Sequence, residues 1–268
     1  KVHRRICKNH IIPQYYLESR TRSPKMQERY LGDWHDFLKF ALLRFLGNTL
    51  ELRVGINWYL TRPEYLGEIG NNDGEQRNHL KGGEWEEWDS DLLTRIRRFE
   101  NPTERHLDRI PASGILPSDT LYFEEPVPMK ERDFWHQRAL LRFADADLVF
   151  LDPDNGFEVS SMEPQNSLKY SFFQEAVDFL LMGKVVVGIQ FARQCDPIER
   201  GITRREQLQT LAGSGAMLPI IRGRVSPNIL FLTLSPPDRV EQVRKTLFDF
   251  ADCSPKFAKD KCRVEIID

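Results

Sequence analysis

The class of fold is indicated most clearly by the stretch Leu148-Val149-Phe150-Leu151-Asp152-Pro153-Asp154-Asn155-Gly156-Phe157-Glu158. A short apolar run ends abruptly in carboxylates and in Asn-Gly, a common turn pair. Such runs indicate strands that are buried on both faces, and these strands belong to parallel sheets. Ligands of open α/β sheets bind just beyond the carboxyl ends of the strands. The stretch therefore predicts an α/β fold with a functional site directly after residue 151. The alternative is an Asx turn with solvated carboxylates, in which Asn-Gly supplies a positive φ.

Strand and helix patterns alternate on both sides of this stretch. Further core strands are expected at 52–60, 120–124 and 184–191, and helices at 33–47, 90–99, 103–110, 130–144, 171–182, 200–211 and 237–251. Two later strands, 217–222 and 228–235, are separated only by a turn, which predicts an antiparallel pair at a sheet edge. The alternation predicts a doubly wound, mostly parallel, Rossmann-like sheet that this pair closes.

Length and composition bound the class of protein. A chain of 268 residues is long enough for one large α/β domain. With 29% charged residues and no apolar run near the roughly 18 residues that span a bilayer, the sequence predicts no membrane partner. The four cysteines show no C-x-x-C spacing, which argues against a zinc knuckle and favours a reduced, cytoplasmic setting.

Residues 1–25 differ in charge from the rest of the chain. They contain seven Lys or Arg and a single acid, Glu18. We expect a basic, disordered N-terminal extension here, with a single α/β domain over 26–268. The alternative is an arm that binds nucleic acid through its positive charge.

Polar side chains follow the ends of three expected strands. If these ends are adjacent in the sheet, their side chains form one crevice. Lys39 lies in an apolar helix and either extends to solvent or directs its ammonium into the site. A loop-like segment over residues 67–83 is long enough for a lid or a cofactor loop. The candidate residues are Asp152, Asp154, Asn155 and Glu158, then Asn57, Tyr59 and Thr61, then Gln190 and Arg193, and in the long loop Asp73 and Gly74.

Two motifs carry a resemblance to a known family. They are Gly32-Asp33-Trp34-His35-Asp36-Phe37-Leu38-Lys39-Phe40 and Leu151-Asp152-Pro153-Asp154. Together they resemble ribosomal-RNA adenine methyltransferases that use S-adenosylmethionine, in which a Gly-Asn-x-x-Asp-x-Leu-Lys-His helix precedes the first strand and Asp-Pro-Pro-Tyr ends the fourth. The closing strand pair is also typical of that fold. Here the second motif diverges, because Asp154 and Asn155 stand in place of the Pro and the aromatic residue.

The resemblance implies a role for several residues. Asp152 would accept hydrogen bonds from a target amine on a nucleic acid or a nucleotide, and Lys39 would line the site. S-adenosylmethionine would be the cofactor, with Asn57, Tyr59, Thr61, Asp73, Gly74, Gln190 and Arg193 as the candidates to bind it. Further motifs, Tyr-Leu-Gly-Asp, Gly-Ile-Asn-Trp-Tyr-Leu-Thr, Asn-Asn-Asp-Gly and Asp-Pro-Asp-Asn-Gly, resemble an uncharacterised bacterial protein family, and that resemblance carries no activity.

Two other functions remain open from the residues alone. Asp152, Asp154 and Glu158 are hard oxygen donors that suit Mg²⁺ or Mn²⁺, so the chain could be a metal-dependent nuclease or phosphohydrolase. A non-catalytic module that binds a nucleotide or a partner is the third possibility. The tryptophans are expected to be core or loop-anchoring aromatics, and the histidines at 35, 79 and 136 share no metal-ligand spacing.

Overall fold

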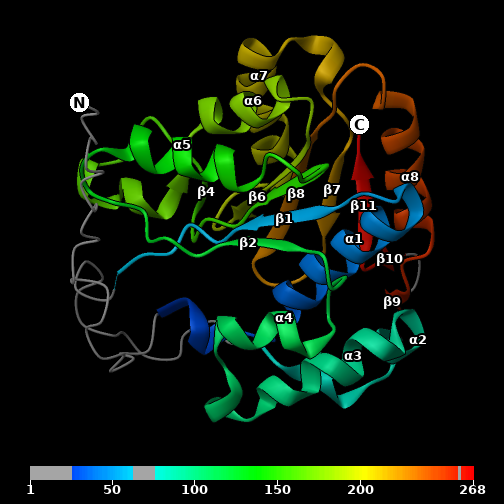
Figure 1. Ribbon diagram of the computed structural model, residues 1–268. Coiled ribbons are helices and arrows are strands. Elements are labelled where there is room, and N and C mark those ends of the chain that lie inside the picture. The colour runs from blue at the N-terminus through cyan, green and yellow to red at the C-terminus, as the bar shows by residue number, and fades with distance from the viewer. Residues whose placement is uncertain (1–25, 63–75, 259–260) are drawn as a thin grey trace, which may run out of the picture.

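The computed structural model describes residues 26–62, 76–258 and 261–268. The expected basic extension and the loop residues Asp73 and Gly74 lie outside these described residues. A mixed α/β architecture surrounds one central sheet of seven strands (Figure 1). In spatial order the strands are β11 (Val264–Ile267), β7 (Ile220–Gly223), β8 (Asn228–Leu234), β6 (Val185–Ala192), β3 (Leu148–Leu151), β1 (Val54–Asn57) and β2 (Leu121–Phe123).

The sheet is mostly parallel, as the sequence predicted. β3 pairs in parallel with β1 on one side and with β6 on the other, so that Leu148 lies opposite both Val54 and Val185. All four residues of β3 are buried, because both neighbours and both faces exclude water from it. The central stretch is therefore a core strand, and Asp152 is the first residue beyond it.

The expected antiparallel pair is confirmed, but its position at the sheet edge is wrong. β7 pairs with β8, and β8 pairs with β6 in the antiparallel sense. The edge is instead β11, which pairs with β7 through residues 264–267. This strand lies at the end of the chain and was not expected, because its four residues are too short to give a clear alternating pattern.

Helices cover both sides of the sheet and form a hydrophobic core on each (Figure 1). On one side, α1 (Trp34–Leu50) and α8 (Val240–Asp252) pack with inward side chains such as Val54 and Phe150. On the other side, Val149 and Val186 pack with α5 (Arg132–Arg142), α6 (Phe173–Leu181) and α7 (Pro197–Ala212). No described helix combines the length and hydrophobicity that crossing a bilayer requires.

The connection from β1 to β2 carries a helical insert beside α1 (Figure 1). It contains α2 (Glu84–Trp88), α3 (Ser90–Ile96) and α4 (Ile110–Ser113), with short 3-10 turns at Asn78–Lys81, Arg97–Glu100, Pro102–Glu104 and Leu107–Arg109. The single helix expected at 103–110 is wrong. The Leu107 amide donates to Glu28 Oε1 at 3.2 Å, so a contact from another segment replaces a bond within a helix. The remaining short strands are β4 (Gly156–Phe157), β5 (Tyr170–Ser171), β9 (Lys256–Ala258) and β10 (Lys261–Cys262), and a 3-10 turn spans Pro164–Lys169.

α1 begins as the sequence predicted and ends later. Asp33 caps it, because Oδ1 accepts hydrogen bonds from the amides of His35 (2.9 Å) and Asp36 (3.1 Å). The expected stop at Gly47 is wrong, since the helix continues to Leu50 and Glu51 takes the left-handed conformation, with φ of 52°. Gly47 instead allows close packing on β1, because a Cβ there would lie 3.2 Å from Val54 Cγ2.

Candidate functional site

The candidate site lies where the chain changes direction across the sheet. After β1 the chain adds β2 on one side, and β3 then pairs on the other side of β1 and continues to β6. Ligands of α/β sheets bind at this kind of switch point, beyond the carboxyl ends of the strands. The carboxyl ends of β1 and β3 are joined here, because the Asp152 amide donates to the Asn57 carbonyl at 2.9 Å.

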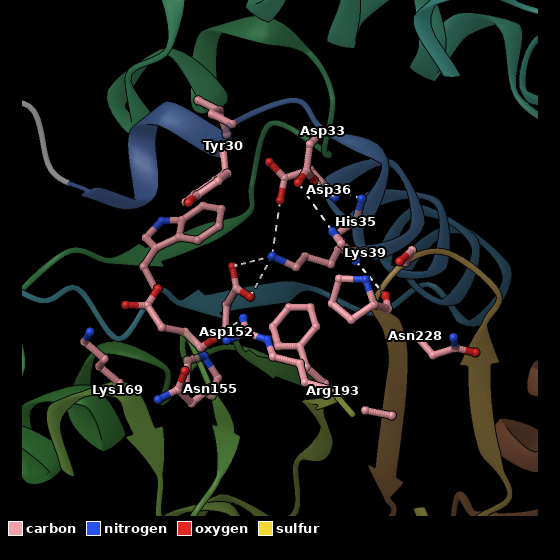
Figure 2. Close-up of a pocket in the computed structure, with 18 of the residues that line it drawn as sticks. Tyr30, Asp33, His35, Asp36, Lys39, Asp152, Asn155, Lys169, Arg193 and Asn228 are labelled. Atoms are coloured by element: carbon pink, nitrogen blue, oxygen red, sulfur yellow. Dashed lines mark hydrogen bonds and ion pairs between the residues drawn. The ribbon is translucent and has the colours of Figure 1, made fainter. Parts of the chain in front are cut away.

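A cavity of about 840 Å³ opens at these strand ends (Figure 2). That volume lies in the upper part of the range that small-molecule and cofactor sites occupy. Residues from α1, the ends of β1, β3 and β6, the β7–β8 turn and the segment before α1 surround it. The lining residues are Tyr30, Leu31, Asp33, His35, Asp36, Lys39, Trp58, Leu107, Asp152, Pro153, Asp154, Asn155, Lys169, Phe191, Ala192, Arg193, Gln194, Ser226, Pro227 and Asn228.

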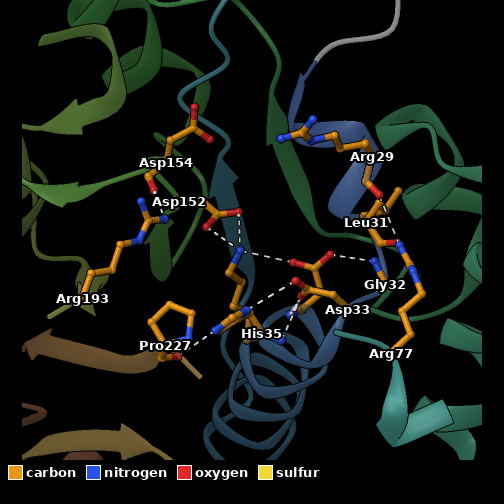
Figure 3. A network of polar contacts seen from close by, with 12 residues as sticks. Arg29, Leu31, Gly32, Asp33, His35, Arg77, Asp152, Asp154, Arg193 and Pro227 are labelled. Carbon is orange, nitrogen blue, oxygen red and sulfur yellow. Dashed lines mark hydrogen bonds and ion pairs between the residues drawn. The ribbon is translucent and has the colours of Figure 1, made fainter. Parts of the chain in front are cut away.

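A buried ion-pair network forms the floor of the cavity. Lys39 Nζ lies 2.9 Å from Asp152 Oδ1 and 3.2 Å from Asp36 Oδ1, so one ammonium joins two carboxylates (Figure 2). Asp36 Oδ2 in turn accepts a hydrogen bond from the Gly32 amide at 2.8 Å. The network extends through Asp33 and His35 at the start of α1 (Figure 3). The helix and the two strand ends are therefore held together at the cavity.

Burial and the neighbouring charges both shift the pKa values of Asp152, Asp36 and Lys39. Burial, together with the nearby Asp36, raises the pKa of Asp152 to about 6 even though Lys39 acts to lower it. Burial likewise raises the pKa of Asp36, with the charge of Asp33 adding to the effect. Burial disfavours the charged form of Lys39, but Asp152 and Asp36 outweigh it and raise the lysine pKa. Lys39 therefore stays protonated, while Asp152 titrates close to neutrality.

His35 ties α1 to the turn between β7 and β8. Its Nε2 lies 2.9 Å from the Pro227 carbonyl and its Nδ1 lies 3.3 Å from Asp33 Oδ2. Burial raises the pKa of Asp33, but hydrogen bonding and charge from His35, with the charge of Lys39, lower it overall. The two ring nitrogens thus join the start of α1 to the β7–β8 turn. His35 also contacts the Phe191 ring edge to face, with centroids 5.3 Å apart.

The turn after β3 is held by backbone contacts and by one buried amide. The Asn155 amide donates to the Lys169 carbonyl at 2.9 Å. Gln190 Oε1 accepts from the Phe157 amide at 3.2 Å, and its Nε2 lies 3.4 Å from the Asn155 carbonyl. Gly156 has a φ of 95°, which agrees with the expected positive φ of the Asn-Gly pair. The polar turn thus has a fixed shape beside the cavity.

The described sequence-derived candidates divide into three groups. Five of them line the cavity: Lys39, Asp152, Asp154, Asn155 and Arg193. Gln190 lies behind the wall and supports the turn, as just described. Four others are described but do not line the cavity: Asn57, Tyr59, Thr61 and Glu158.

Hydrogen bonds explain where three of those four residues lie. The Tyr59 hydroxyl donates to Glu175 Oε2 at 2.9 Å, and Arg132 Nε contacts the same carboxylate at 2.6 Å, in a buried structural network. Asn57 Oδ1 accepts from the Tyr59 amide at 3.3 Å. Glu158 Oε1 accepts from the Phe173 amide at 2.8 Å, at the start of α6.

The carboxylates at the site are arranged around a lysine. Within the described ranges, no group of three or more His, Cys, Asp or Glu side chains is positioned to hold a metal ion. Lys39 lies between Asp36 and Asp152, and its ammonium supplies the positive charge there. This arrangement can accept a hydrogen bond from a ligand N–H and hold a proton at Asp152.

Several lining residues were not singled out by the sequence reasoning. Asp33 and Asp36 precede Lys39 within two helical turns, so helical spacing could have placed them on the same side. Trp58 was expected to be a core aromatic, and it is both buried and part of the cavity wall. Tyr30, Lys169, Phe191 and Asn228 come from separate segments, and nothing in their local sequence indicated this site.

The fold and the site together define an α/β protein with a charged cavity beyond the carboxyl ends of β1 and β3. A comparison with protein-family models found no match, and neither did a comparison with the curated proteins.

Proposed function

We propose that this chain is a methyltransferase-like protein that binds S-adenosylmethionine and acts on an amine of a nucleic acid or a nucleotide. One observation carries the proposal. Lys39 and Asp152, the two residues that the resembling motifs single out, lie 2.9 Å apart at the switch point although 113 residues separate them. Two motifs that resemble one family are thus joined at one ligand crevice.

The strand arrangement supports the same proposal. Helices on both sides of the sheet agree with a doubly wound topology. The reversed strand β8 lies between β6 and β7, so a closing antiparallel pair follows the parallel part of the sheet. That pair is a feature of the fold to which the sequence motifs pointed.

The cavity residues fit a cofactor of this kind. S-adenosylmethionine is a nucleoside that carries an ammonium, a carboxylate and a sulfonium, so it has an excess of positive charge. Four carboxylates line the cavity, from Asp33, Asp36, Asp152 and Asp154, against the cations of Lys39, Lys169 and Arg193 and the ring of His35. Aromatic faces from Tyr30, Trp58 and Phe191 can pack against a nucleoside base. When bound, the cofactor supplies an activated methyl group.

The protein residues would orient the target amine and manage its proton. Above a pH of about 6 the carboxylate of Asp152 is ionised and accepts a hydrogen bond from the amine N–H. The amine lone pair then points away from Asp152, and the same carboxylate can take the proton that the amine must lose. Lys39, which Asp36 also contacts, would hold the Asp152 carboxylate in place, while the buried floor would exclude water from the reacting amine.

The second motif lacks the aromatic residue of the resembling family, so a different side chain would have to stack on the target base. Asn155 occupies the position of the aromatic residue in the resembling family. Phe191, three residues beyond the part of β6 that pairs with β3, lines the same cavity and offers a ring face. We propose that this ring packs against the target base.

Titration calorimetry with S-adenosylmethionine tests the cofactor, and transfer of a labelled methyl group to RNA or to nucleotides tests the reaction. We expect the wild type to bind and to transfer. Asp152→Asn should lose transfer, whereas Asp145→Asn, an exposed carboxylate before the other end of β3, should keep it. No binding heat at millimolar cofactor would refute the proposal. Binding without transfer to any of these substrates would instead indicate a non-catalytic module.

A further inference from the structure

We propose that Lys169 and Arg193 form a phosphate-binding subsite at the mouth of the cavity. The subsite would hold one phosphate of the substrate beside the carboxylates of the floor. The assignment of that substrate to nucleic acid or nucleotide rests on the proposed function, but the phosphate chemistry rests on these two side chains themselves.

The backbone of Lys169 and the side chain of Arg193 contact the same turn. The Lys169 carbonyl accepts the Asn155 amide at 2.9 Å, and Arg193 Nη2 lies 3.5 Å from the Asp154 carbonyl. The turn 154–155 therefore lies between Lys169 and Arg193, and both side chains line the cavity (Figure 2). The guanidinium of Arg193 also lies over the Phe191 ring, 5.1 Å from its centroid, which restricts its orientation.

The cation on the floor of the cavity has carboxylate partners, whereas the two cations at its mouth do not have them among the described residues. On the floor, the ammonium of Lys39 is shared between the carboxylates of Asp36 and Asp152, so it already has anionic partners. In the described part of the chain, neither the Lys169 ammonium nor the Arg193 guanidinium lies within ion-pair distance of a carboxylate. An anion at the mouth would therefore gain two charge-assisted contacts without breaking an existing ion pair.

Phosphate is the anion that this pair of cations suits. A planar guanidinium can donate two parallel hydrogen bonds to phosphate oxygens, and a lysine ammonium can neutralise the remaining charge from another direction. Phe191 and Arg193 both line the cavity and the guanidinium lies over the ring, so a base packed beside Phe191 would have its phosphate near Arg193. The phosphate could be a diester in a nucleic acid strand or a monoester on a free nucleotide.

The test compares Lys169→Gln/Arg193→Gln with Lys184→Gln/Arg53→Gln. The control pair lies before the opposite ends of β6 and β1 and also removes two positive charges. Anisotropy of a labelled mixed-sequence single-stranded RNA measures affinity over a range of salt, and adenosine monophosphate serves as competitor. We expect the first variant to weaken RNA binding about tenfold for each cation removed. The slope of log affinity against log salt should fall by about 1.4. The control should match the wild type.

The outcomes separate the two sources and the two proposals. Displacement of RNA by the monophosphate, lost in the first variant, indicates a free nucleotide, and no displacement indicates the strand backbone. Equal affinity and equal salt slope in both variants refutes the subsite, as does a wild type that binds neither probe. Titration with S-adenosylmethionine is the independent reading. If the cofactor binds while RNA affinity does not depend on the two cations, the subsite is wrong and the proposed function stands. If the cofactor does not bind while RNA affinity depends on the two cations, only the proposed function is overturned.

Discussion

The ammonium of Lys39 lies 2.9 Å from Asp152 Oδ1 and also 3.2 Å from Asp36 Oδ1. The three side chains belong to a helix and a strand end that are far apart in the sequence, and all three are buried or nearly so. One cation therefore compensates two carboxylates that the fold has removed from water. Buried charges with no partner are costly, so the contact links the stability of the fold to the geometry of the site.

Lys39→Met should destabilise the protein by about 3–5 kcal/mol at neutral pH, because it leaves Asp36 and Asp152 buried without their shared cation. Loss of the cation raises both carboxyl pKa values further above those of the unfolded chain. Protonation of a carboxyl removes the penalty of its buried charge, so the deficit should shrink as the pH falls from neutral toward 6. Urea unfolding at neutral and acidic pH measures this.

Lys245→Met provides the control for that variant. Lys245 forms an exposed i,i+4 pair with Asp249 at 2.6 Å, and pairs of this kind contribute only about 0.3–0.5 kcal/mol. A loss in the Lys39 variant no larger than in this control would contradict a buried, shared ion pair.

The pH dependence of methyl transfer should follow the ionisation of Asp152. Burial raises its pKa from 3.8 to about 6, so the protonated form, which cannot accept the amine hydrogen bond as well, persists to higher pH than in an exposed carboxyl. We expect the rate to rise about tenfold per pH unit below that pKa and to level off above it. Initial rates over the acidic to neutral range measure the profile.

Asp152→Asn should lower the plateau rate by at least about hundredfold, because general acid–base groups typically contribute that much or more. The rising limb near 6 should also disappear, since the titrating group is gone. An unchanged limb in this variant would assign the titration to another residue.

The sequence predicted the position of the site because that position depends on local patterns. A short apolar run that ends in Asp152 is enough to place a buried strand and its carboxyl end. Asp33 was predictable as a helix cap because its side chain bonds to amides only two and three residues later. Both features arise within one element and its nearest neighbours in the chain.

The rest of the site depends on contacts between distant segments. Tyr59 follows β1 as a cofactor residue would, yet its hydroxyl bonds to Glu175, which is 116 residues away. Glu158 is close to Asp152 in sequence, but its carboxylate accepts the Phe173 amide on α6. Lys169 enters the cavity wall through a backbone bond to Asn155. No local pattern encodes these pairings, since each is decided by packing between elements.

Gly156→Ala should cost about 2–3 kcal/mol, at the upper end of the range for strained backbone, because it combines two effects. The φ of 95° is unfavourable for a residue with a Cβ, and that Cβ would lie 2.8 Å from Gln190 Oε1 and 3.0 Å from its Cα. Gly183→Ala is the matched variant, since it has a φ of 76° and no atom within 4 Å of its Cβ position. It should cost about 1–2 kcal/mol from backbone strain alone. Equal losses in urea unfolding would show that Gln190 yields to the methyl group.

His79 should make the protein less stable in acid. Its side chain is fully buried, with its ring 6.0 Å from Phe37 and 5.7 Å from Trp85. Burial above all, with the nearby charge of Arg77, lowers the pKa of His79 from 6.5 to about 4. The unfolded chain therefore binds a proton at a higher pH than the folded one. Stability from this group is present above 6.5 and is lost as the pH falls toward 4, for a total of about 3 kcal/mol.

His79→Leu removes the titrating ring and keeps an apolar side chain between the two aromatics. Whatever the variant loses in packing at neutral pH applies at every pH, so the comparison rests on the change in unfolding free energy between neutral pH and pH 4. We expect that change to be about 3 kcal/mol smaller in the variant than in the wild type, because the other titrating groups are common to both. Urea titrations of both proteins across this range measure the difference. Parallel stability curves would mean that the folded protein accommodates a protonated His79 as readily as the unfolded chain does, which would contradict the lowered pKa.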